Sequence, residues 1–195
     1  SIAFNTSLQK YGGDIAVGAM TVISSLMQMC MLPMQGLTQG AQPIISYNFG
    51  ANKPDRVKKA FFTQFCTCVI YTTAFWLVVM IFPKAFATIF TSDKELVTYS
   101  AWALRIYMAG IFSLGFQVSC QQSFMALGQA KVSLLLACLR KIVLLIPLIF
   151  ILPNFFDNKV FAVFLAEPVS DIIAATVTTI TFFTLFNSIL KKEKR

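Results

Sequence analysis

Five long apolar segments restrict this chain to a membrane fold. They cover roughly residues 15–45, 60–82, 96–127, 132–152 and 168–190. A helix needs about 20 residues to cross a hydrocarbon core of roughly 30 Å, and each segment reaches that length. None shows the strict alternation of a barrel strand, so the backbone can satisfy its hydrogen bonds in lipid only as helices. The sequence therefore predicts an all-α, polytopic membrane helix bundle.

The composition agrees with a lipid environment. Only 12% of the 195 residues are charged, whereas soluble domains average about a quarter. Residues 1–8 read as a short helical piece in front of a glycine-containing turn, and we interpret them as the outer end of a preceding helix. We therefore expect five complete spans and part of a sixth, as in a truncated chain.

Basic residues are divided unevenly between the two ends of the predicted spans. Because consecutive spans alternate in direction, the loops form two sets, and the set richer in Lys and Arg faces the cytoplasm. One set has nine, at residues 53–59, Lys131 and residues 191–195. The other set, interspersed with acids, has four, namely Lys10, Lys84, Lys94 and Lys159. This division of the basic residues predicts a cytoplasmic C-terminus, with a tail that meets anionic lipid headgroups. Because the basic residues lie almost entirely between the apolar segments and at the C-terminus, the net charge of +8 does not indicate a nucleic-acid partner.

Residues that carry most enzyme chemistry are missing or scattered. The chain has no histidine, and Cys66 and Cys68 would point to nearly opposite sides of one helix, where they cannot easily bind one metal ion. A membrane-embedded hydrolase or transferase needs paired carboxylates or a nucleophile with its base. Only Asp171 lies well inside a predicted span, with Glu167 near its edge. We expect no enzyme, no metal site and no bound cofactor.

Polar side chains recur along one face of the first segment. On a helical wheel, seven residues fall within about 60° of one another: Thr21, Ser24, Gln28, Gln35, Gln39, Gln42 and Ser46. An unpaired glutamine is costly in hydrocarbon, so this face must meet other helices or water. The third segment repeats the pattern with Ser113, Gln117 and Gln121. We predict that both faces line one substrate pathway, and packing between helices is the alternative for any single glutamine.

Charged residues also lie inside the predicted spans. An ionised group at mid-helix costs about 2.5–3.5 kcal/mol on insertion scales, so Asp171 is a candidate functional acid. Its expected partners are Arg140 and Arg105, and depth in the bilayer favours Arg105. Asp171, Arg140 and Arg105 are therefore candidates for the substrate pathway, while a structural ion pair is an equally open interpretation.

Glycines and prolines interrupt the first segment. Gly36 and Gly40 form a G-x-x-x-G pattern, which is typical of close helix packing. Pro33 and Pro43 suggest a broken helix of the kind that transporters place near binding sites. Both interpretations remain open from the sequence.

The end of this segment carries a specific motif. Residues 36–51 read Gly-Leu-Thr-Gln-Gly-Ala-Gln-Pro-Ile-Ile-Ser-Tyr-Asn-Phe-Gly-Ala. This run resembles the signature of MATE transporters at Gly36, Gly40, Pro43, Asn48, Gly50, Ala51 and, a little later, Arg56. Later helices in the MepA-like branch of that family are similar to residues 115–117, 123–131, 139–141, 146–148 and 166–171. The resemblance covers essentially the whole chain.

The resemblance implies the second six-helix lobe of a MATE-type transporter of the MOP superfamily. It implies antiport, in which Na⁺ or H⁺ enters while an amphiphilic, often cationic, drug leaves between two lobes. In the NorM-like branch an acid three residues before the position of Gln117 helps to bind the cation, and here that residue is Leu114. The coupling ion is therefore expected mainly in the first lobe, and the second lobe alone is not expected to transport.

Two other functions stay open. A flippase for lipid-linked precursors, from the same superfamily, would also use a wet central cleft. It would need several basic residues in its lumen, and the intramembrane ones here are Arg105, Arg140 and Lys141. A purely structural subunit would leave the row of glutamines unexplained.

Overall fold

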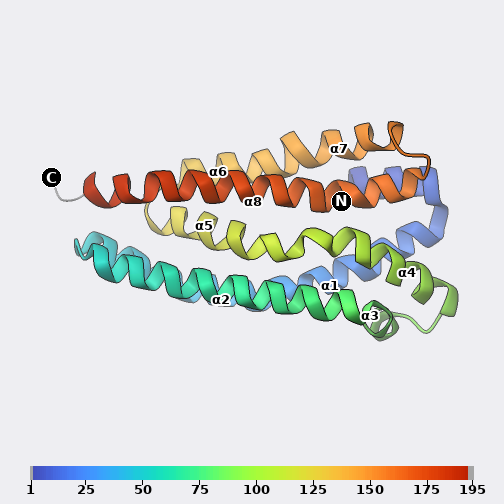
Figure 1. Ribbon diagram of the computed structural model, residues 1–195, viewed down its shortest axis with the longest axis horizontal. Coiled ribbons are helices and arrows are strands. Elements are labelled where there is room, and N and C mark those ends of the chain that lie inside the picture. The colour runs from blue at the N-terminus through green and yellow to red at the C-terminus, as the bar shows by residue number, and fades with distance from the viewer. Residues whose placement is uncertain (1, 193–195) are drawn as a thin grey trace.

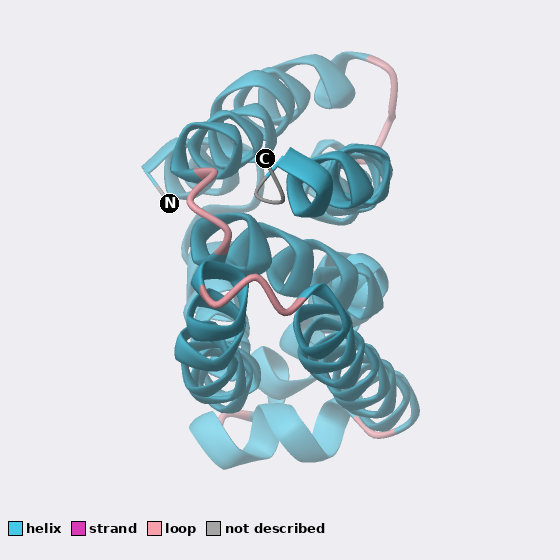
Figure 2. Ribbon diagram, turned by 90° about the vertical axis from the view of Figure 1, so that its left-hand side faces the viewer, coloured by secondary structure: helices cyan, strands magenta, loops and turns pink. Residues whose placement is uncertain are grey.

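The computed structural model describes residues 2–192, and within that range the chain forms helices and short connections but no strand (Figures 1 and 2). Five helical segments are long and apolar enough to cross a membrane. The predicted all-α membrane bundle is thus confirmed. Lys194 and Arg195 of the predicted basic tail lie outside the described residues, and so does Ser1.

The first helical element, α1 (Ile2–Gly50), is two helices joined by a sharp break. Gly13 has φ 66° and ψ −159°, a backbone conformation that residues with a Cβ rarely adopt. Figure 1 shows the blue ribbon turning back at this point, so the short N-terminal helix runs antiparallel to the rest. The helix continues through Pro33 and Pro43, and the break lies at Gly13 instead.

The remaining spans contain short segments of tighter or wider helix. The second span is α2 (Pro54–Ile81), followed by the short helix α3 (Pro83–Phe90). The third consists of α4 (Lys94–Tyr107), a 3₁₀ segment η1 (Met108–Ser113) and α5 (Leu114–Ala126). The fourth consists of α6 (Ala130–Cys138), a π-helical segment η2 (Leu139–Leu145), α7 (Ile146–Ile151) and η3 (Leu152–Asn154). The fifth is α8 (Lys159–Lys192).

The start of the fifth span differs from the sequence-based expectation. A helix start at Pro168 is wrong, because α8 already begins at Lys159 and passes through the proline. Gly110 of η1 packs closely against this proline, since a Cβ built at Gly110 would lie 2.8 Å from the Pro168 Cα.

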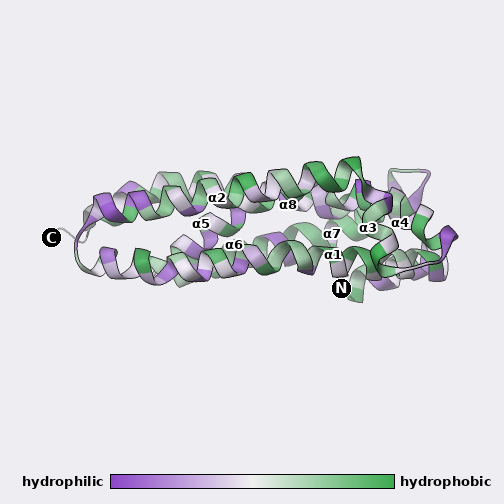
Figure 3. Ribbon diagram, turned by 90° about the horizontal axis from the view of Figure 1, so that it is seen from below, coloured by the Kyte–Doolittle hydropathy of each residue, from purple (hydrophilic) through white to green (hydrophobic). Residues whose placement is uncertain are grey.

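The connections gather at the two ends of the bundle. The connections at residues 51–53 and 127–129 lie at the same end as the C-terminus, and the break in α1 and the connection at residues 155–158 lie at the other (Figure 1). Figure 3 shows polar residues concentrated in these connections. The helices therefore alternate in direction, as the division of the basic loops requires.

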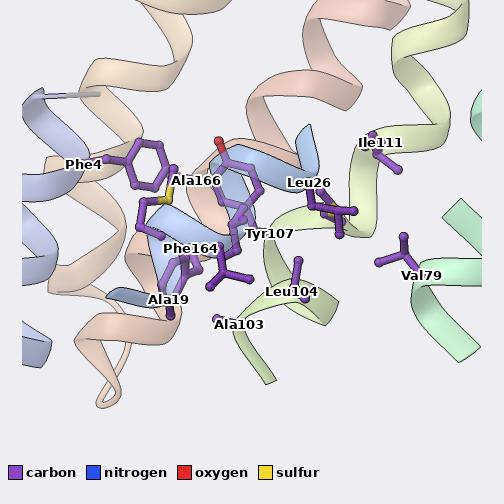
Figure 4. Packing of buried hydrophobic residues seen from close by; sticks show 14 of the residues in the cluster. Phe4, Ala19, Leu26, Val79, Ala103, Leu104, Tyr107, Ile111, Phe164 and Ala166 are labelled. Atoms are coloured by element: carbon purple, nitrogen blue, oxygen red, sulfur yellow. The ribbon is translucent and has the colours of Figure 1, made fainter. Parts of the chain in front are cut away.

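Two clusters of buried side chains hold the helices together. The larger joins α1, α4 and α8, and Figure 4 shows Phe4, Leu104, Tyr107 and Phe164 in it. The smaller is rich in phenylalanine and joins α2, α5 and α8, with Phe61 stacked on Phe182 at 4.5 Å between ring centroids. These two clusters fix the rotation of each helix about its axis and so decide which polar residues face outward.

Candidate functional site

The polar face of α1 is open in this chain. Gln28, Gln35, Gln39, Thr21, Ser24 and Ser46 are exposed, and Gln42 is half-buried. Within residues 2–192 the side chains of the four glutamines form no hydrogen bond, whereas the Ser46 hydroxyl donates to the Ala126 carbonyl at 2.8 Å. Contacts within the described residues therefore do not explain why four glutamines lie on one face of this helix.

Small and apolar residues share this open surface. A Cβ added at Gly36 or Gly40 would meet no atom within 4 Å, so the G-x-x-x-G pattern is not a packing face between described helices. Leu32 is well exposed and lies one helical turn from both Gln28 and Gln35, and Tyr47 is exposed farther along the same helix. The result is an amphiphilic surface, with amide groups next to the apolar side chain of Leu32.

The polar residues of α5 lie elsewhere. Gln117 is only 1% exposed, and its Oε1 has no hydrogen-bond partner among the described residues. Gln121 donates from Nε2 to the Ser133 carbonyl at 3.3 Å, and the Ser133 hydroxyl donates to the Gln121 carbonyl at 3.2 Å. The structure thus does not bring Gln117 and Gln121 onto one surface with the α1 glutamines. Gln121 instead links α5 to α6.

We predict a small stability effect from this link. Replacement Ser133→Ala removes one hydrogen bond between α5 and α6, and such bonds in membrane proteins average about 0.6 kcal/mol. The unfolding free energy of the full-length protein in mixed micelles should fall by about that amount. Ser119→Ala is the matched control, because its hydroxyl donates within its own helix at 2.6 Å, and a larger loss there would contradict the assignment.

A buried charge cluster connects η2 to α8. The Arg140 Nε donates to Asp171 Oδ1 at 2.6 Å, and its Nη2 lies 3.4 Å from Glu167 Oε1. The Lys141 Nζ lies 3.2 Å from the same Glu167 oxygen. Both carboxylate residues are 1% exposed. The two carboxylates and most of the Arg140 side chain are therefore buried, and the Lys141 side chain, which is 55% exposed, adds the second positive charge from the surface.

Local helix geometry explains why these four side chains meet. Glu167 and Asp171 are four residues apart on α8, so they lie on one face. Arg140 and Lys141 are adjacent in sequence and lie in the π-helical segment, whose wider turn changes the direction of side chains and often marks a functional site. The Ser170 hydroxyl also donates to the Arg140 carbonyl at 3.1 Å. The cluster thus fixes the register of α8 against η2.

Two expectations about this cluster require correction. Arg105 is not the partner of Asp171: it is exposed and makes no ion pair within residues 2–192. The side chain of Arg105 is turned about the α4 axis toward α2 and α3 instead. Glu167 does not lie at a span edge, because α8 starts earlier than expected. The spacing of Glu167 and Asp171 was the sequence signal for this pair.

The motif residues at the end of α1 build a turn. The buried side-chain amide of Asn48 donates from Nδ2 to the Ile44 backbone carbonyl at 2.8 Å, and the backbone carbonyl of Asn48 accepts the Lys53 N–H at 2.9 Å. Gly50 ends α1 and Ala51 begins the connection, and the Arg56 N–H donates to the Lys53 carbonyl at 3.1 Å. Pro43 lies just over one turn before Asn48 and is exposed. The motif therefore shapes the tight connection from α1 to α2.

Taken together, these features define a polytopic helical membrane protein with an amphiphilic open face and a buried charge cluster. The family model MatE matches residues 1–151. The chain belongs to the MatE family, and the resemblance seen at residues 36–51 is confirmed.

Curated relatives agree with this membership. The chain is 24% identical over 175 residues to the multidrug export protein MepA of Staphylococcus haemolyticus (strain JCSC1435), covering 89% of this chain and 38% of that protein. It is 26% identical over 155 residues to MepA of Staphylococcus aureus (strain N315), covering 80% of this chain and 34% of that protein. The chain thus spans less than two-fifths of the length of either relative.

Solved structures show the same fold. The MATE multidrug transporter DinF-BH has 31% identity and a TM-score of 0.79, over 94% of this chain and 41% of that one. An outward-facing MATE family transporter has 17% identity and a TM-score of 0.89, over 97% of this chain and 43% of that one. At that lower identity the likeness concerns the fold alone.

Proposed function

We propose that this chain is the second lobe of a MATE-type multidrug exporter that releases amphiphilic drugs across the cytoplasmic membrane. The observation that carries the proposal is the open face of α1, where Gln28, Gln35 and Gln39 are exposed without partners among the described residues. Such a face is stable in a membrane only beside water or a further polar surface. An N-terminal lobe of the same transporter would supply the opposite wall.

The chemistry of this face suits amphiphilic drugs. Glutamine amides donate and accept hydrogen bonds, while Leu32 and Tyr47 offer apolar contact on the same helix. Ligand sites of this kind combine mostly apolar walls with a few polar groups. Multidrug export by the MepA relatives supports the same class of substrate.

Coupling to Na⁺ or H⁺ is part of the proposal. Leu114 is fully buried and apolar, so its side chain provides no oxygen for a cation at that position. We place the main coupling site in the N-terminal lobe for that reason. Asp171 is already paired with Arg140, which favours a structural role for it over direct ion binding.

The proposed orientation in the membrane rests on the basic loops. The end of the bundle with residues 51–53 and 127–129 carries most of the loop lysines and arginines. By the positive-inside rule we assign this end to the cytoplasm, and the C-terminus with it.

The observed ion pairs disfavour a lipid-precursor flippase. Arg140 is bound to Asp171 and Glu167, and Lys141 also contacts Glu167. These two cations are therefore not free to bind an anionic headgroup in a lumen. Non-enzymatic transport of drugs is the function that the geometry supports best.

The proposal predicts that the open face is needed for export. In the full-length transporter, Gln35→Leu combined with Gln39→Leu should reduce export of a fluorescent cation such as ethidium roughly tenfold, as expected when hydrogen bonds worth about 1.4 kcal/mol are lost. Efflux from drug-sensitive cells at matched protein levels measures this. Thr63→Val combined with Thr67→Val is the control, because both hydroxyls are exposed and donate only to backbone carbonyls of their own helix, α2. Unchanged export in the glutamine variant would refute the proposed role of this face.

A further inference from the structure

A second group of charged side chains lies beside the short helix α3. Its helices are different from η2 and α8, which carry the charge cluster. A cavity of about 420 Å³ is bordered by the end of α2, the start of α3 and the middle of α4. Its apolar walls include Ile81, Phe82, Trp102 and Ile106, and two cations, Lys84 and Arg105, line it as well. The cavity therefore combines apolar walls with positive charge.

The charge in this cavity is uncompensated. No Asp or Glu lines it, and within residues 2–192 neither Lys84 nor Arg105 forms an ion pair, since all three ion pairs there join Arg140 or Lys141 to α8. Lys84 also lies in the first turn of α3, where the helix dipole disfavours a cation. Two unpaired positive side chains around one cavity favour the binding of an anionic ligand.

The depth of the cavity points to the lipid headgroup region. Figure 1 shows α3 nearly end-on beside α2, so it lies across the bundle rather than along it. Phe82 and Ile89 are more than half exposed on or beside this helix, and Trp102 is 38% exposed. Apolar side chains on a short crosswise helix, together with tryptophan, are typical of a membrane interface. Phosphate groups of lipids lie at that level.

We propose that this cavity binds the phosphate headgroup of an anionic phospholipid, held by Arg105 and Lys84, with an acyl chain against Ile81, Phe82 and Ile106. The planar guanidinium of arginine suits two phosphate oxygens at once, and lysine adds a point charge. The apolar walls select a lipid over a free anion, because inorganic phosphate would leave them without a partner. This site is separate from the proposed drug pathway on α1.

Lipid titration of the full-length transporter tests the proposal. Purified in neutral detergent, the protein is titrated with short-chain phosphatidylglycerol, and native mass spectrometry measures the fraction that carries one lipid. Replacements Arg105→Gln and Lys84→Gln should each weaken binding roughly fivefold, the factor expected for one basic side chain at a membrane surface. Arg105→Lys should retain part of the affinity. Lys94→Gln is the matched control, since Lys94 is exposed at the start of α4 but lines no part of the cavity.

The outcomes separate lipid from other ligands. Phosphatidylcholine and inorganic phosphate should not compete for the site, which would support an anionic lipid. Equal phosphatidylglycerol binding by the wild type and the Lys84→Gln, Arg105→Gln double variant would overturn the proposal, and so would full competition by inorganic phosphate. Because lipid retention is measured without transport, a failure of the drug-export proposal would leave this result interpretable.

Discussion

Replacement of Arg140 by methionine is expected to destabilise the full-length transporter by about 3–5 kcal/mol, the cost of removing one partner from a buried ion pair. Arg140 is the only described side chain that contacts both Glu167 and Asp171. Without it, Asp171 would be a buried carboxylate with no ion-pair partner among the described residues. The unfolding free energy in mixed micelles, measured by denaturant titration, checks the size of the loss.

Two further variants show whether charge is the cause. Lys141→Met should cost less than about 1 kcal/mol, because the side chain of Lys141 is 55% exposed and exposed ion pairs are weak. Adding Asp171→Asn to Arg140→Met should recover much of the loss, since a buried pair replaced by neutral groups is often tolerated. Equal losses for Arg140→Met and Lys141→Met would show that the cluster does not depend on buried charge.

The cluster also shows what the sequence could and could not predict. The five spans followed from the length of their apolar segments, because in lipid the backbone has few alternatives to a helix. The sequence also placed Arg105 and Asp171 inside helical segments that are long enough to cross a membrane, as the structure has them. The rotation of each helix about its own axis could not be predicted from the sequence, because it depends on how phenylalanines and small residues from several helices pack together. Arg105 was therefore preferred over Arg140 as the partner of Asp171, and that preference was wrong.

The same limit applies to the glutamines. Periodicity put Gln28, Gln35 and Gln39 on one face of α1 and Gln117 with Gln121 on one face of α5. Which face each helix turns outward depends on its neighbours. The α1 face is open, whereas Gln117 is buried between helices. The 3₁₀ segment η1 and the π-helical segment η2 add to the difficulty, since each shifts side-chain directions relative to a regular α-helix.

Gly110 links helix packing to the charge cluster. Its replacement by alanine should also lower the stability of the full-length transporter markedly. A Cβ at this position would lie 2.8 Å from the Pro168 Cα and 2.9 Å from the Pro168 carbonyl oxygen. Backbone atoms cannot move aside alone, so α8 would have to shift away from η1. Overpacking of this kind costs about 1–3 kcal/mol. Because Pro168 directly follows Glu167, the same shift would lengthen the contacts of Arg140 and Lys141 with that carboxylate.

Gly18→Ala separates this effect from the general influence of alanine on a helix. At Gly18 the nearest atom to an added Cβ is a Leu96 methyl group at 3.2 Å, the flexible end of a side chain that can rotate. Alanine also favours helix over glycine by roughly 0.5–1 kcal/mol, so this variant should keep or gain stability in the same denaturant titration. If Gly110→Ala were equally stable, η1 and α8 could separate without cost. The close contact at Pro168 would then not be what holds Glu167 in reach of Arg140.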